Sequence, residues 1–184
     1  DMGAGTNESI AAAARSGFGL MQSTLPSVHV IGEHIEHYRQ HMKEAPDPWN
    51  QNPAFGDVDV ARMAFVAETD AKAKELSEDG ITHHMKSFMA GGSKTGGYLG
   101  DISDKNDTSQ FAYDKLAADT LLHGSPDTIL RKIEEFKAVG TTSLVLHYPP
   151  YYGQERTVEM LRLFAKEVLP HIQAMDVPRL IAAE

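Results

Sequence analysis

The stretch Gly5-Thr6-Asn7-Glu8-Ser9 places two hydroxyl groups and a carboxamide just before an alanine-rich run. Thr6 or Asn7 can cap a helix that begins at about Glu8 and ends before Gly17. Hydroxyls and free backbone amides at a helix N-terminus face an anion, and the helix dipole favours one there. Glu8 fits beside an anion only if its side chain points away. On these residues alone, a plain capped helix is favoured over an anion site.

Three histidines offer a second kind of chemistry. His34, His37 and His41 lie at i, i+3 and i+7 in the stretch GEHIEHYRQH, so a helix would place them on one side. Such spacing can bind zinc, and two glutamates are close by. However, the histidines flank the apolar stripe of the expected helix, and no second set of ligands is apparent. A solvated helix face is favoured, and no metal site is predicted. The adjacent His83 and His84 point in different directions on a helix and lead to the same conclusion.

The composition bounds the classes of protein to which the chain can belong. It has 184 residues, 41% hydrophobic and 23% charged, which is ordinary for one soluble domain. Its net charge is −9 and its basic residues do not cluster, which argues against a nucleic-acid partner. Cysteine is absent, so disulfides, thiolate metal sites and a cysteine nucleophile are excluded. No apolar run approaches the roughly 20 residues that span a bilayer. We therefore expect a cytoplasmic protein with no membrane partner.

Apolar periodicity predicts buried strands that alternate with amphipathic helices. Such alternation is typical of a parallel sheet, but three strands are too few for a complete barrel or doubly wound sheet. The chain therefore has the pattern of the back portion of a larger fold. Residues 91–114, which are rich in Gly, Ser, Asp and Asn, interrupt the pattern. The predicted strands are 18–22, 58–68 and 143–147, and the predicted helices are 8–16, 28–43, 70–89, 126–139 and 155–174.

Four segments, in this order, resemble the C-terminal half of the bacterial-luciferase-like flavin monooxygenases. They are GTNESIAAAARSGFGLMQS, VARMAFVAETDAKAKEL, HGSPDTILRKIEEFKAVGTTSLVLH and MLRLFAKEVLPHI. The resemblance implies an α/β fold, the C-terminal portion of a (β/α)8 TIM-type barrel. The three strands would be barrel strands six to eight, and the first helix would follow strand five. Residues 1–184 would then be the C-terminal half of a single barrel domain whose N-terminal half is missing.

The resemblance also implies a function. The expected activity is that of a flavin-dependent monooxygenase that uses reduced FMN, supplied by a separate flavin reductase, and dioxygen on a small organic substrate. The expected assembly is a homodimer or a heterodimer. Two alternatives stay open. One is a deazaflavin-dependent oxidoreductase, and the other is a non-catalytic flavin-binding protein or partner subunit of the same fold.

The resemblance implies which residues bind the cofactor, but it implies no catalytic residue in this chain. The segment after strand five resembles a phosphate cradle for FMN, which implies that Thr6, Asn7 and Ser9 bind the cofactor. With the resemblance, the phosphate site is favoured over the plain cap. The catalytic histidine of the family lies in the missing half, so no catalytic residue is assigned to this chain.

Two further segments are candidates through their place in the barrel. Loops at the C-terminal ends of barrel strands build the active site, so His147, Tyr148, Tyr151 and Tyr152 either line the pocket or cover the barrel mouth. Residues 91–114 resemble a mobile lid that shields the reaction chamber, and the alternative is a surface loop without a role.

Overall fold

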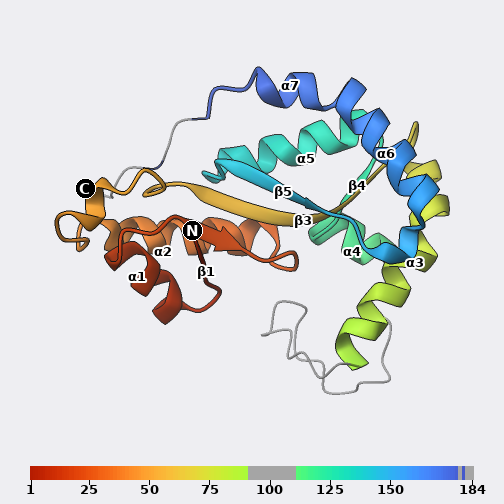
Figure 1. The fold of residues 1–184 in the computed structure, drawn as a ribbon. Coiled ribbons are helices and arrows are strands. Elements are labelled where there is room, and N and C mark those ends of the chain that lie inside the picture. Colours follow the sequence, from red (N-terminus) through yellow and green to blue (C-terminus); the bar gives the residue numbers. More distant parts are fainter. Residues whose placement is uncertain (91–110, 178–179, 181–184) are drawn as a thin grey trace. The chain divides into compact units, whose positions relative to one another are not determined.

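The structure is a computed structural model that describes residues 1–90, 111–177 and 180. Helices and strands alternate along the chain (Figure 1). The chain forms two compact units. One comprises Asp1–Ala61, Glu134–Val145 and Asp176–Glu184, and the other comprises Arg62–Ile133 and Leu146–Met175. Each unit is described separately below.

The first unit is built on short parallel strands. β1 (Met2–Gly3) pairs with β2 (Leu20–Gln22), which pairs with the first part of β3 (Val58–Val66). α1 (Asn7–Arg15) connects β1 to β2, and α2 (Val28–Met42) lies between β2 and β3 in the sequence. A 3₁₀ turn, η1 (Trp49–Gln51), precedes β3. The parallel pairing predicted from the alternating pattern is confirmed.

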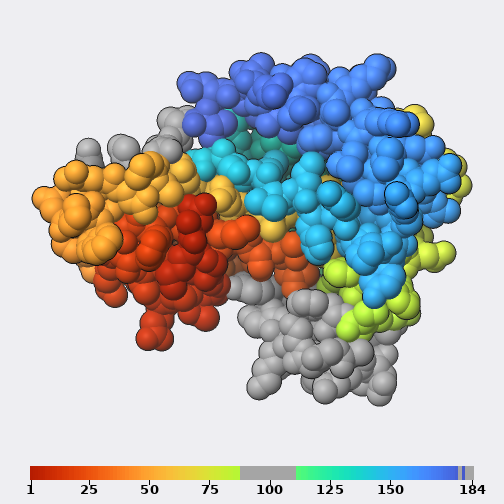
Figure 2. Space-filling view, viewed as in Figure 1, coloured from red at the N-terminus to blue at the C-terminus, as the bar shows by residue number. Residues whose placement is uncertain are grey.

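The core of this unit lies between the strands and two helices that pack against each other. α1 presents Ala13 and Ala14 to the interior, and both are fully buried. Because alanine has a short side chain, the α1 backbone can approach α2 closely. In Figure 2 the red and orange atoms of this part of the chain form one continuous surface. The other apolar side chains of this core include Ile10, Leu20, Ile31, Ile35, Tyr38, Val58 and Val60.

The second unit begins within β3, whose last part pairs in parallel with β4 (Leu122–Gly124). The long helix α3 (Asp70–Ala90) follows β3, and the short helix α4 (Tyr113–Asp119) precedes β4. α5 (Pro126–Ala138) begins in this unit and ends in the first, and β5 (Ser143–His147), which pairs with β3, begins in the first unit and ends in this one. The chain continues through the 3₁₀ turn η3 (Pro150–Tyr152), α6 (Gln154–Glu167) and α7 (Leu169–Gln173).

The three predicted strands are confirmed, with β2 beginning at Leu20 instead of Phe18. The sequence did not predict β1 or β4, which have two and three residues. The predicted last helix is two helices, because it breaks at Val168 and Pro170 opens the next turn. Of the predicted lid, 91–114, residues 91–110 lie outside the described part of the chain. Residues 111–114 are described and differ from a loop, because Phe111 and Tyr113 are buried and Tyr113 begins α4, a helix that the sequence did not predict. Among the described helices, none is long and apolar enough to cross a membrane.

Candidate functional site

The N-terminus of α1 carries a reciprocal cap made by Thr6 and Ser9. Thr6 is the N-cap residue, and its Oγ1 accepts a hydrogen bond of 3.2 Å from the Ser9 backbone N–H. In return, Ser9 Oγ accepts hydrogen bonds from the backbone N–H groups of Gly5 (3.2 Å) and Thr6 (3.0 Å). The arrangement is a capping box, with Ser9 in the place that Glu or Gln usually takes. Of the two caps that the sequence allowed, Thr6 and Asn7, the structure has Thr6.

The two hydroxyl protons of the cap differ in how firmly they are held. Ser9 Oγ donates to the Thr6 carbonyl oxygen at 2.9 Å, so its proton is held within the cap. Thr6 Oγ1 donates to Ser9 Oγ at 3.0 Å, and Ser9 Oγ already accepts from two backbone amides. Thr6 can therefore turn its hydroxyl toward an incoming anion and lose only one weak bond. Ser9 contributes mainly by holding the cap.

The first turn of α1 also has two backbone N–H groups without a hydrogen-bond acceptor among the described residues. Within the described residues, the N–H groups of Asn7 and Glu8 donate to no acceptor. Unpaired amides at a helix N-terminus point along the axis and carry its positive partial charge. Thr6, Asn7 and Glu8 are exposed, so an anion can reach these donors from solvent. This turn thus has the donors that a phosphate group requires.

Side chains from β2 and α2 hold the segment that leads into this turn. Gln22, at the end of β2, donates from Nε2 to the Ala4 carbonyl oxygen at 2.8 Å. Its Oε1 lies 2.6 Å from His34 Nδ1 on α2. Gln22 is 1% exposed and His34 is 9% exposed, so both bonds are shielded from water. Burial lowers the pKa of His34, which keeps the ring neutral at physiological pH.

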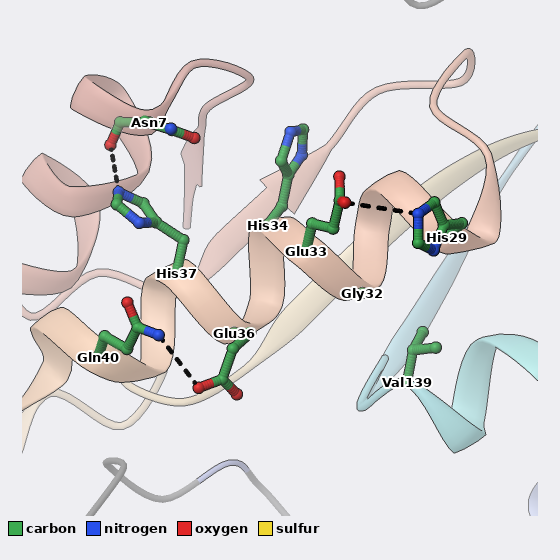
Figure 3. A pocket seen from close by; sticks show the side chains of 9 residues that line it. All are labelled: Asn7, His29, Gly32, Glu33, His34, Glu36, His37, Gln40 and Val139. Carbon is green, nitrogen blue, oxygen red and sulfur yellow. Dashed lines mark hydrogen bonds and ion pairs between the residues drawn. The ribbon is translucent and has the colours of Figure 1, made fainter.

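A second histidine of α2 contacts α1 directly. His37 Nε2 lies 3.0 Å from the Asn7 carbonyl oxygen, and Figure 3 shows its ring directed from α2 toward Asn7. A polar hollow of about 680 Å³ lies beside this contact. It is lined by Asn7, His29, Gly32, Glu33, His34, Glu36, His37, Gln40 and Val139.

The predicted absence of a metal site concerns the same histidines. His37 bonds a carbonyl oxygen and His41 Nδ1 lies 2.6 Å from Glu44 Oε1, so these side chains have separate partners. In the described ranges no group of three or more His, Asp or Glu side chains is arranged to hold a metal ion. The prediction of a solvated face is wrong for His34, which is buried against Gln22. The 3–4 spacing from Ile31 to Tyr38 places position 34 on the buried side, and that signal was available in the sequence.

The N-terminus of α5 is a similar helix start, but a carboxylate of the protein already occupies it. Asp70 Oδ1 accepts a hydrogen bond of 2.6 Å from the Ser125 backbone N–H, and Oδ2 accepts one of 3.0 Å from Thr128 Oγ1. These bonds, the Ser125 N–H first, lower the pKa of Asp70. A second anion at this turn would meet the charge of Asp70. Of the two helix starts, that of α1 is therefore the one suited to a phosphate.

The loop after β5 separates the aromatic residues that the sequence grouped together. The rings of Tyr151 and His83 lie 4.4 Å apart, and those of His147 and His84 lie 5.7 Å apart. Tyr148 and Tyr151 are each 45% exposed, as candidates for a pocket lining or cover would be. Tyr152 differs, because it is buried and bonds His123 at 2.8 Å. Tyr152 therefore belongs to the interior of the second unit.

Comparison with known proteins identifies the family. The family model for luciferase-like monooxygenases matches residues 1–143, which is most of the chain. The chain belongs to this family. Among curated proteins, no relative matches the chain.

Solved structures with the same fold include both monooxygenases and a reductase. The first is the oxygenating constituent of 3,6-diketocamphane monooxygenase from Pseudomonas putida, a type II Baeyer–Villiger monooxygenase in complex with FMN. It has 24% identity and a TM-score of 0.67, over 94% of this chain and 47% of that chain. The second is the coenzyme F420-dependent tetrahydromethanopterin reductase from Methanopyrus kandleri, with 20% identity and a TM-score of 0.62, over 92% of this chain and 50% of that chain. A monooxygenase from Streptomyces bottropensis has 20% identity and a TM-score of 0.55, over 91% of this chain and 46% of that chain.

The chain thus spans about half the length of these luciferase-like relatives. The relatives are TIM barrels, and the parallel strands of this chain alternate with helices as theirs do. The predicted fold class, α/β with parallel strands that form part of a TIM-type barrel, is confirmed. Membership of the luciferase-like monooxygenase family supports an oxidoreductase.

Proposed function

We propose that this chain supplies the phosphate end of the flavin site in a monooxygenase that uses reduced FMN and dioxygen on a small organic substrate. The observation that carries the proposal is the first turn of α1, where Asn7 and Glu8 have backbone N–H groups without acceptors among the described residues. Such a turn, in a luciferase-like chain, suits the phosphate of a flavin nucleotide.

In this proposal each residue of the turn has a distinct task. The amides of Asn7 and Glu8 and the hydroxyl of Thr6 donate to phosphate oxygens. Ser9 keeps the turn in place through its bonds to Gly5 and Thr6. The bound flavin supplies the redox chemistry, and the chain supplies binding and orientation. No described residue is assigned to catalysis.

The choice of FMN over a deazaflavin coenzyme follows a relative and not the charges beside the turn. Glu8 is exposed in the turn, and Glu33, in the hollow next to Asn7, lies 3.4 Å from His29. Exposed carboxylates would repel the phosphate of either coenzyme, and salt would weaken that repulsion. The support for FMN is the 3,6-diketocamphane monooxygenase component, which is in complex with FMN.

Two other functions are compatible with the same fold, and the test below distinguishes them from the proposed one. The F420-dependent relative favours a hydride-transferring oxidoreductase as the second candidate. A non-catalytic flavin-binding subunit is the third. In the proposed function, a separate flavin reductase supplies the reduced FMN.

The test combines binding and turnover. FMN and coenzyme F420 are titrated against the protein, and dioxygen uptake is then followed with chemically reduced FMN and a set of small ketones. The proposal expects tighter binding of FMN than of F420, with oxygenated product formed in proportion to flavin oxidised. Tighter binding of F420 with no oxygenated product would support hydride transfer, and FMN binding without any product would support a non-catalytic subunit.

A further inference from the structure

We propose that Gln22, His34 and His37 are positioning residues for the phosphate site, so that β2 and α2 build the site together with α1. This inference rests on the proposed function, because it concerns the same turn. None of the three side chains needs to touch the flavin. They act on the carbonyl groups of Ala4 and Asn7, which bracket Gly5 and Thr6.

His34, Gln22 and the Ala4 carbonyl group form a chain of two hydrogen bonds, called the relay below, in which each bond has one direction. Gln22 Nε2 donates to the Ala4 carbonyl oxygen, which can only accept, so Gln22 Oε1 is the atom that faces His34. The amide oxygen accepts, and His34 must therefore carry its proton on Nδ1. Each partner fixes the orientation of the next, from α2 through Gln22 to Ala4. The backbone adds a bond of 3.2 Å from the Ala4 N–H to the Met21 carbonyl oxygen.

His37 holds the other side of the segment. The Asn7 carbonyl oxygen accepts from His37 Nε2 at 3.0 Å, which requires the proton of His37 on Nε2. Asn7 is the first residue of α1, and its N–H is one of the two open donors. Fixing its carbonyl group therefore helps to fix the direction in which the first turn presents its amides.

The burial of Gln22 and His34 indicates that the relay defines a geometry and does not only fill space. A buried polar pair contributes little net stability compared with well-packed apolar side chains of the same size. Its particular effect is to define one geometry, because each bond has a direction. In the relay this geometry is the path of the chain from β1 into the turn that donates to phosphate. The donors are useful only if that turn is held in place before the ligand arrives.

The experiment compares the dissociation constants of FMN and riboflavin, which has no phosphate, in the wild type and in Gln22→Met, His34→Leu, His34→Asn and His37→Leu. We expect FMN affinity to fall about tenfold in Gln22→Met, His34→Leu and His37→Leu, equivalent to ~1.4 kcal/mol. Riboflavin affinity should change by less than about threefold. His34→Asn should recover most of the loss, because its amide can donate from the place of Nδ1. His29→Leu, on the same helix but exposed and paired with Glu33, should leave the FMN-to-riboflavin ratio unchanged.

The ratio of the two affinities separates positioning from folding. A variant that is partly unfolded binds both flavins more weakly by the same factor, so its ratio does not move. If the wild type prefers FMN and the ratio is unchanged in His34→Leu and His37→Leu, the positioning role is overturned while the phosphate site stands. If His34→Asn loses as much as His34→Leu, the relay through Nδ1 is overturned. If the wild type does not prefer FMN, the proposed phosphate site fails, and this inference fails with it.

Discussion

His123 Nε2 and the Tyr152 hydroxyl form a buried hydrogen bond of 2.8 Å. His123 lies in β4, and Tyr152 lies in η3, the turn that follows β5. The Ser77 hydroxyl donates to the Ala73 carbonyl oxygen at 2.7 Å, so it accepts from His123 Nδ1 at 3.1 Å. His123 is therefore neutral with its proton on Nδ1, and Tyr152 donates to Nε2. This bond anchors the turn that presents the exposed ring of Tyr151.

The neutral state of His123 predicts a loss of stability in mild acid. Burial, and to a lesser degree Lys132, lowers the pKa of His123 from 6.5 to about 3. Below pH 6.5 the unfolded chain takes up a proton that the folded chain does not. Stability should therefore fall between pH 6.5 and about 3, by up to ~1.4 kcal/mol per pH unit. Urea unfolding at pH 7, 5.5 and 4.5 measures the slope, which should be shallower in His123→Gln. Equal slopes would show that His123 is not the group responsible.

The same cluster predicts unequal effects for two tyrosine hydroxyls. Tyr152→Phe removes the 2.8 Å donor and leaves His123 Nε2 buried without a partner, which should cost about 1–3 kcal/mol. Tyr113→Phe removes a longer contact of 3.3 Å to Nδ1, which Ser77 also meets, together with the bond between Tyr113 and Ser77, and leaves Nε2 satisfied, so it should cost less. Chemical denaturation of both variants at pH 7 tests the order. A larger loss in Tyr113→Phe would contradict the assigned direction of these bonds.

Two glycines within helices predict opposite effects of the same change. Glycine in a helix interior is normally less stable than alanine by about 1 kcal/mol. A Cβ at Gly32 of α2 would meet only Val139 at 3.4 Å, so Gly32→Ala should be neutral or stabilising. A Cβ at Gly80 of α3 would lie 2.8 Å from the Tyr151 carbonyl oxygen and 2.9 Å from the Tyr152 ring. Gly80→Ala should therefore destabilise the protein and lower its melting temperature. A stabilising Gly80→Ala would show that η3 does not pack closely on α3.

The contact between α3 and α5 predicts the effect of removing the Asp70 carboxylate. Asp70→Ala takes away the acceptor for Ser125 N–H and Thr128 Oγ1, and should destabilise by about 1 kcal/mol, as the loss of a helix cap does. Because the folded pKa of Asp70 is lowered, its contribution is present at neutral pH and is lost as the pH falls below 3.8. Asp127→Ala, in the first turn of α5, is the matched control and should cost less. Equal losses would mean that only the charge near the helix dipole matters.

Features made by residues close together in the sequence could be predicted from the sequence. The cap of α1 needs only Thr6 and Ser9, which are three residues apart, and Thr6 is one of the two caps that the sequence predicts. β1 and β4 escaped prediction because two or three residues cannot show a period. Val168 and Pro170 divide the last helix within an otherwise continuous apolar stripe, so periodicity alone joined α6 to α7.

The rest of the site depends on contacts that distant parts of the chain make. Gln22 and His34 become a pair only when α2 folds back over the end of β2, and neither residue alone signals this. His123 lies in a sequence that reads as a helix start, and its burial depends on α3 and η3. Tyr152 was grouped with Tyr151 because both follow β5, yet neighbouring residues in a tight turn can face opposite sides.

The central claim is that the first turn of α1 binds the phosphate of FMN, and one titration tests it most directly. The dissociation constants of FMN and riboflavin are measured for the wild type and for the Thr6→Ala/Ser9→Ala variant. Loss of the Thr6 donor and of the cap that holds the amides should weaken FMN binding by about a hundredfold, or ~2.7 kcal/mol. Riboflavin affinity should change by no more than a few-fold. Unchanged FMN affinity, or an equal loss for both flavins, would contradict the claim and leave these residues as a helix cap alone.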